Sequence, residues 1–172
     1  MRRFGPWFLH LLFLAVMQTV VGGSLEVFRI KPDFFLISVV LVAMDRGARA
    51  GALWGAVLGL VQDVLSGGVV GLSFLTKPAV GYAVGMLRSK LDFGNPNTQT
   101  LTTLGVGLAE GFVLSVLLSA YQPSKAVSWT MYRIILPQSI YNSLLVPLIL
   151  PATRLFRGWL EGLGNRPSRM AE

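Results

Sequence analysis

Cysteine is absent from this sequence, and histidine occurs once among its 172 residues. The lack of thiols excludes a disulfide framework and a thiolate zinc site, and one imidazole cannot form a histidine cluster. Charged residues are also scarce, at 13%, whereas hydrophobic residues make up 53% of the chain. This balance is too apolar for a soluble domain of this length. The composition therefore predicts an integral membrane protein that holds no metal and no other cofactor.

Acidic residues are few as well, with eight against fifteen basic ones and a net charge of +7. Such an excess of positive charge can indicate nucleic-acid binding when it gathers on a polar face interleaved with aromatic residues. Here the basic residues lie between and after apolar runs instead. We therefore expect no nucleic-acid partner and attribute the charges to membrane topology.

The apolar runs predict an all-α fold of about six transmembrane helices in one bundle. The first run also fits a signal peptide, but the later runs favour an uncleaved span. Pro32 and Asp33 are expected to open the second helix, whose 13 residues reach about 20 Å, less than the ~30 Å hydrocarbon core. That helix is therefore suited to a thin membrane, continues past Asp45, or is re-entrant. The six ranges are 4–21, 32–44, 45–63, 69–87, 100–121 and 129–151.

The chain divides into a polytopic membrane domain over 1–152 and a basic amphipathic tail over 153–172. With six spans, the lysines and arginines segregate ten to four between the two sides, which places both termini in the cytoplasm. The amphipathic tail would then lie on the cytoplasmic membrane surface. The ten are Arg2, Arg3, Arg46, Arg49, Arg88, Lys90, Arg154, Arg157, Arg166 and Arg169, and the four are Arg29, Lys31, Lys125 and Arg133.

Glycine recurs at every fourth position of the predicted third helix, and Asp63 continues the same register. Residues at i and i+4 share a face, so this helix presents a groove that ends in a carboxylate. Each glycine would cost about 0.8–1 kcal/mol in a soluble helix relative to alanine, whereas small residues in lipid let helices pack closely. We predict that the return arm or a partner's helix packs here. The glycines are Gly47, Gly51, Gly55 and Gly59, with Gly81 and Gly85 at the same spacing on the return arm.

We predict that three ionisable side chains lie at membrane depth: Asp63, Lys77 and Glu110. A charge at membrane depth costs a few kcal/mol or more unless it is paired or hydrated. Asp63 is the nearest candidate partner for Lys77 in the sequence, so we predict an ion pair between them. The alternatives are that the Lys77 side chain snorkels toward water or that it belongs to a ligand site. Between these two residues, Ser66, Gly67 and Gly68 should end the third helix.

The segment from Pro32 to Gly85 resembles the core of the bacterial rod shape-determining protein MreD family. The pattern is a Pro-Asp that opens a short apolar helix, a basic turn, a glycine-spaced helix, a Gln-Asp pair running into Ser-Gly, and a following Gly-Leu. Tyr141 and Asn142, followed by LLVPLILPATRLF, are similar to the last helix of that family, whereas Lys77 has no place in the pattern. The matching residues are Pro32, Asp33, Arg46, Gly47, Gly51, Gly55, Gly59, Gln62, Asp63, Ser66, Gly67, Gly71 and Leu72.

This resemblance implies a non-enzymatic component of the cell-elongation machinery in the inner membrane. Its expected partners are MreC first, and then MreB, RodA and a penicillin-binding transpeptidase. The family is also similar in fold to the substrate-binding subunits of energy-coupling-factor transporters, so a small-molecule carrier is the alternative. A carrier would need a cavity of roughly 300–1,000 Å³ with convergent polar groups. An enzyme is not expected, because no nucleophile, metal cluster or phosphate loop accompanies the carboxylates.

Overall fold

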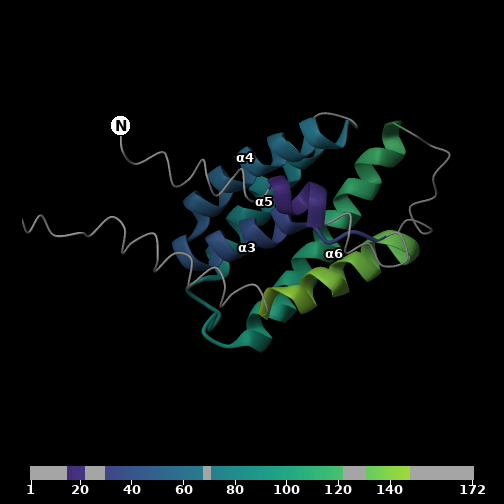
Figure 1. Ribbon diagram of the computed structural model, residues 1–172. Coiled ribbons are helices and arrows are strands. Elements are labelled where there is room, and N and C mark those ends of the chain that lie inside the picture. Colours follow the sequence, from purple (N-terminus) through teal and green to yellow (C-terminus); the bar gives the residue numbers. More distant parts are fainter. Residues whose placement is uncertain (1–14, 22–29, 68–70, 122–130, 148–172) are drawn as a thin grey trace, which may run out of the picture.

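The computed structural model of this chain describes residues 15–21, 30–67, 71–121 and 131–147, and these ranges are helical without a β-strand. Two short π-helical turns, η1 and η2, accompany the helices labelled α3 to α6 in Figure 1. The second turn runs directly into an α-helix over 136–147. The elements are η1 (Met17–Val21), α3 (Phe34–Arg46), α4 (Ala48–Ser66), α5 (Leu72–Leu87), α6 (Pro96–Tyr121) and η2 (Met131–Ile135).

Helix α3 is short and largely buried, and it packs against both α4 and α5 (Figure 1). As expected, Pro32 and Asp33 precede its first turn, and the Asp33 carboxylate accepts a hydrogen bond from the Leu36 N–H as an N-cap. The helix ends at Arg46, because Gly47 follows with φ of +85° and ψ of −174°, a combination open almost only to glycine. The helix therefore extends one residue past Asp45 and stops before the next helix begins at Ala48.

Helices α4 and α5 form an antiparallel hairpin with the closest packing among the described elements. Ser66 is the last residue of α4, and Gly67 closes it in the left-handed conformation, as is common after a helix. The predicted break at Ser66 and Gly67 is confirmed. A hydrogen bond from Trp54 Nε1 to Ser38 Oγ, at 3.0 Å, ties α4 to α3.

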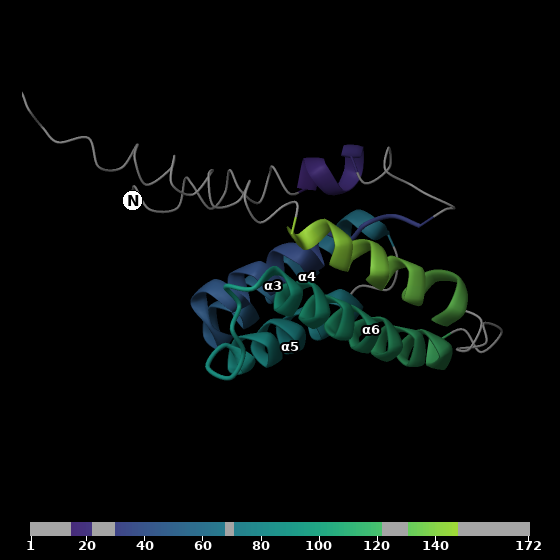
Figure 2. The same cartoon turned by 90° about the horizontal axis from the view of Figure 1, so that it is seen from below.

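Helix α6 is the one helix in the described ranges long and apolar enough to cross a membrane, over Pro96–Ala120. Only 22% of its most apolar window is buried inside the protein. The helix over 136–147 runs alongside it (Figure 2). Large apolar side chains on α6 are correspondingly exposed: Leu101, Phe112, Val113, Val116 and Leu118.

Several predicted features lie outside the described residues, among them most of the first span, the loop after α6, the end of the last span and the tail over 153–172. The six-span topology therefore stays a prediction. In the described part, 32–44 corresponds to α3, 45–63 to most of α4, 69–87 to α5 and 100–121 to α6.

Candidate functional site

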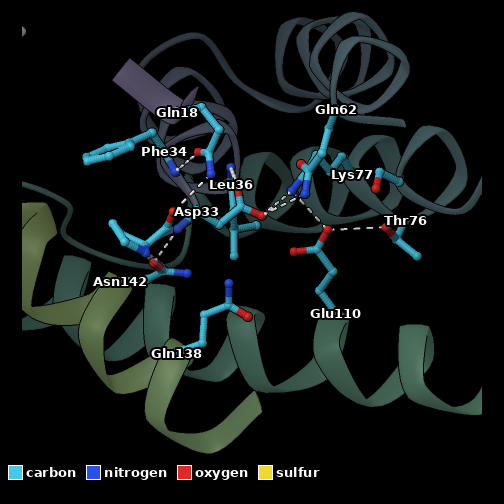
Figure 3. Close-up of polar contacts among 12 residues, drawn as sticks. Gln18, Asp33, Phe34, Leu36, Gln62, Thr76, Lys77, Glu110, Gln138 and Asn142 are labelled. Carbon is cyan, nitrogen blue, oxygen red and sulfur yellow. Dashed lines mark hydrogen bonds and ion pairs between the residues drawn. The ribbon is translucent and has the colours of Figure 1, made fainter. Parts of the chain in front are cut away.

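Lys77 lies at the centre of a buried charge cluster between α3, α5 and α6. Its side chain is fully buried, and Nζ donates to Asp33 Oδ2 at 2.8 Å and to Glu110 Oε1 at 3.2 Å (Figure 3). The predicted ion pair between Lys77 and Asp63 is wrong. The side chain of Lys77, which lies midway along the α4–α5 groove, points toward α3 and α6. Asp63 lies at the end of the groove, where it bonds the first residues of α5.

Asp33 connects four segments of the chain. Its Oδ1 caps α3 through the Leu36 N–H at 2.8 Å, and its Oδ2 also accepts from Gln62 Nε2 of α4 at 3.4 Å. Its own N–H donates to Asn142 Oδ1 at 2.9 Å. Together with the bond to Lys77, these contacts make Asp33 the residue through which α3, α4, α5 and the helix over 136–147 are joined.

Glu110 brings the middle of α6 to the same cluster. Its Oε1 accepts from Thr76 Oγ1 as well as from Lys77 Nζ, both at 3.2 Å. The Glu110 side chain is only 4% exposed and that of Lys77 1%. Removing one partner from such a buried ion pair costs about 3–5 kcal/mol, because the remaining charge is left without compensation.

Asp63 has a different role from the one expected, since it caps the N-terminus of α5. Its carboxylate accepts from the backbone N–H groups of Gly71 at 2.8 Å and of Ser73 and Phe74 at 3.0 Å. These are among the first N–H groups of α5, which have no partner within the helix. The fourfold register of α4 places Asp63 on the face toward α5, so the groove ends in a cap for the facing helix.

Five of the six predicted glycines bring the backbones of α4 and α5 together. A Cβ atom added at any of them would lie within 3.0 Å of backbone atoms of the facing helix or its first residues, closer than real Cβ atoms come. The groove is therefore filled by the return arm of the same chain. The contacts are Gly51 with Gly81, Gly55 with Lys77 and Pro78, Gly59 with Ser73 and Phe74, and Gly85 with Gly47 and Ala48.

Gly47, the sixth, serves as the turn between α3 and α4 and does not belong to the groove of α4. Its positive φ explains the glycine, because an added Cβ would meet nothing nearer than Arg88 Nη1 at 3.8 Å. Gly47, Gly51, Gly55 and Gly59 are evenly spaced in the sequence, so the spacing alone does not show that Gly47 forms a turn and the other three pack against α5.

A polar cavity of about 100 Å³ adjoins the charge cluster. We define the polar cavity by its lining residues: Asp33, Leu36, Gln62, Gly107, Glu110, Gly111, Leu114, Ile135, Gln138, Ser139 and Asn142. Sites for organic ligands usually measure roughly 300–1,000 Å³. The polar cavity thus has convergent polar groups but room for an ion or a few water molecules and not for a vitamin. Within the described residues, no group of His, Cys, Asp and Glu side chains is arranged to hold a metal ion.

Sequence reasoning recognised Lys77 and Glu110 as buried charges but missed Asp33, Gln62 and Asn142 as members of the site. Asp33 was assigned only to the helix cap, although a carboxylate at the start of a short apolar helix was a visible signal. Gln62 and Asn142 appeared only as positions of the family pattern. Nothing in their spacing placed them beside Lys77, which is 15 residues from one and 65 from the other.

The comparison with protein families gives one match, which covers nearly the whole chain. A family model described as rod shape-determining protein MreD matches residues 1–158. No curated protein and no solved structure matches the chain. The matched range contains the glycine hairpin, the charge cluster and the polar cavity, whereas the expected likeness to energy-coupling-factor subunits has no structural match behind it.

Proposed function

The chain belongs to the MreD family of rod shape-determining proteins, and we propose that it is a non-catalytic scaffold in the inner membrane that supports lateral peptidoglycan synthesis. The family match carries this proposal. The buried polar groups also support it, because their hydrogen bonds connect different helices to one another. A scaffold needs a rigid bundle, and the glycine hairpin and charge cluster supply one.

We propose a multi-pass topology with both termini in the cytoplasm. The ends of the described helices support it, because the α3–α4 turn and the α5–α6 connection lie at one end of the bundle, with Gly47 beside Arg88. Arg46, Arg49 and Lys90 are on these same connections, whereas Lys31 precedes α3 at the other end. That is the segregation expected for cytoplasmic and periplasmic connections.

MreC is the proposed principal partner, with MreB, RodA and a penicillin-binding transpeptidase in the same assembly. Since the glycine groove is filled within the chain, partners must use outward faces. Helix α4 exposes 72% of Leu53, and α6 exposes 66% of Leu101. Exposed apolar side chains on the membrane-embedded surface of a protein contact either lipid or the helix of another protein.

A complementation assay with photo-crosslinking tests this proposal. The gene should restore rod shape to cells depleted of their own MreD, and photoreactive residues at Leu53 and Leu101 should crosslink to MreC from at least one of the two faces. Val39 in α3, which is fully buried, serves as the matched control and should give no crosslink to MreC. Round cells despite normal protein levels would contradict the scaffold function, and lipid adducts alone at both positions would contradict the partner assignment.

A further inference from the structure

The buried charges of the site do not balance. Asp33 and Glu110 contribute two carboxylates, whereas Lys77 contributes one ammonium group. None of the described residues that line the polar cavity is basic. An isolated charge inside a protein is very unfavourable, so the excess negative charge is neutralised either by a bound cation or by a proton on a carboxylate.

The excess falls on Glu110, because the acceptor positions of Asp33 are occupied. Asp33 Oδ1 accepts from Leu36 and Oδ2 from Lys77 and Gln62. Glu110 uses only Oε1 in its two hydrogen bonds. Its Oε2 has no hydrogen-bond partner in the described part of the chain, and Figure 3 shows this oxygen turned away from Lys77 and Thr76, toward the side of Gln138.

Gln62 presents a second oxygen without a partner. The Gln62 amide orientation is fixed, because Asp33 Oδ2 can only accept and therefore faces Nε2. Gln62 Oε1 is left buried and has no hydrogen-bond partner among the described residues. A buried acceptor without a donor costs about 1–3 kcal/mol. Glu110, Gln62 and Ser139 are all lining residues of the polar cavity, and Ser139 as a whole is 2% exposed.

We propose that the polar cavity binds one small monovalent cation, with Na⁺ as the ion to be tested. Carboxylate, amide and hydroxyl oxygens are the donors that hard cations prefer. One positive charge neutralises the cluster, whereas a divalent ion would leave it positive. The volume of about 100 Å³ accommodates an ion with a few waters, each of which takes about 30 Å³ in the liquid.

The bound cation would join α4, α6 and the helix over 136–147 at the point where Asp33 already joins α3 and α5. Water alone could satisfy the hydrogen bonds of the two oxygens but would leave the charge. This proposal concerns an ion site and goes beyond the scaffold function, on which it does not depend.

Thermal unfolding of the purified full-length protein in detergent micelles tests the proposal. Na⁺ is exchanged for N-methylglucamine at constant ionic strength, so that only the small cation changes. A ligand that binds the folded state raises stability with its concentration, and we expect a saturable rise in Tm of roughly 5–10 °C between its absence and about 100 times its Kd. A wild-type Tm that is independent of Na⁺ would overturn the proposal. If the Tm rose instead when the pH was lowered, Glu110 would carry a proton in place of a bound cation, and the proposal would again be overturned.

Variants locate the effect. Glu110→Gln removes the excess charge, so the rise in Tm with Na⁺ should disappear. If Glu110→Gln does not fold, Ser139→Ala decides, because losing one oxygen donor should increase the Na⁺ concentration at half-maximal effect several-fold. Ser143→Ala is the matched control, since Ser143 is equally buried one turn further on, donates to the Ile140 carbonyl and is not among the lining residues. Equal Na⁺ responses in Ser139→Ala and Ser143→Ala, or an unchanged response in Glu110→Gln, would show that the ion does not bind in the polar cavity.

Discussion

Two antiparallel helix pairs in this protein contain glycines at fourfold spacing, yet they pack in different ways. Between α4 and α5, the glycines bring backbone against backbone. Between α6 and the segment over 131–147, Gly107 faces the side chain of Ser139, and Gly111 faces that of Ile135. Gly105, on the same helix α6, faces nothing within 4 Å.

The difference shows what close packing excludes. Where two backbones touch, no side chain fits between them, and along the α4–α5 groove an added Cβ would meet backbone atoms of the facing helix. Where side chains separate the helices, their polar ends leave space, and the polar cavity lies on this side of the bundle. The α4–α5 interface therefore holds its two helices in one arrangement, whereas the interface between α6 and the segment over 131–147 leaves space beside polar side chains. The following variants test this contrast.

Substituting Gly55 should have the largest effect. Even the methyl group of Gly55→Ala meets the backbone of Lys77 and Pro78, which cannot move without separating the two helices and losing many van der Waals contacts. We expect Gly55→Ala to reduce the folded protein in the membrane fraction severely and Gly55→Leu to abolish it. Overpacking usually costs about 1–3 kcal/mol of stability. We expect a clash with backbone atoms to cost about 3 kcal/mol or more, because the backbone cannot turn aside as a side chain can.

The controls for this prediction are Gly105→Ala and Val57→Leu. Gly105→Ala makes the same change on a helix where the Cβ meets nothing, and Val57→Leu enlarges a side chain of α4 that is 42% exposed. Both should accumulate and unfold like the wild type. If Gly55→Ala behaved like Gly105→Ala in level and Tm, the backbone contact would not be a requirement of the fold.

Removing the ammonium group of Lys77 should have the next largest effect. Lys77→Met leaves two buried carboxylates beside each other and should lower the free energy of unfolding by about 3–5 kcal/mol. Adding Glu110→Gln removes one of the orphaned charges, so Lys77→Met/Glu110→Gln should be more stable than Lys77→Met alone. Chemical unfolding in detergent measures both.

A matched double variant separates the true partner from the predicted one. Lys77→Met/Asp63→Asn should be less stable than Lys77→Met, because Asp63 caps α5 and does not contact Lys77. A rescue by Asp63→Asn equal to that by Glu110→Gln would be incompatible with the observed hydrogen bonds.

Much of the fold could be predicted from local signals. Pro32 and Asp33 before an apolar run, Ser66 and Gly67 after one, and glycines at i and i+4 are each decided within a few residues, and the structure has the corresponding helix boundaries. The family resemblance is confirmed by the match over residues 1–158. By contrast, the number of membrane spans depends on parts of the chain outside the described residues. Within the described ranges, α6 alone is long and apolar enough to cross a membrane.

The site could be predicted only in part, because its geometry depends on which helices meet. Lys77 and Glu110 stood out as charges in apolar runs, but the choice between Asp63 and Asp33 as a partner needed the packing of α3 on α5. Likewise, Gly59 and Gly111 look alike in sequence, each in an apolar helix with glycine four residues before it. Only the facing surface shows that one meets backbone and the other a side chain.

Asp63→Asn should have a moderate effect confined to the hairpin. The amide keeps one acceptor oxygen but loses the charge and one acceptor for the three N–H groups of α5, and loss of a helix cap costs about 0.5–2 kcal/mol. We expect a Tm lowered by about 2–8 °C. Asp45→Asn is the control, because Asp45 is exposed and pairs with the equally exposed Arg46, whereas the first N–H groups of α5 are bonded by Asp63. A change in Tm equal in the two variants would indicate a general charge effect and not capping.

The smallest effect is expected at Gly111, and it sharpens the contrast between the two interfaces most directly. A methyl group there meets the Ile135 side chain, whose Cγ2 and Cγ1 are the nearest atoms. The Ile135 side chain can change its rotamer to make room, and alanine favours the helix more than glycine does. Gly111→Ala should therefore cost only about 1 kcal/mol of stability or less. Ile135→Ala alone should leave a cavity and cost about 2–5 kcal/mol, but in Gly111→Ala/Ile135→Ala the new methyl occupies part of the vacated space. A double-mutant cycle measured by unfolding should therefore give a favourable coupling of about 1 kcal/mol.

No truncation opposite Gly55 can produce such a rescue, because Gly55 contacts backbone atoms, the Lys77 carbonyl and the Pro78 nitrogen, and these remain whatever side chains stand at the two positions. Strict additivity at Gly111 and Ile135 would mean that the new methyl group does not occupy the space left by the Ile135 side chain.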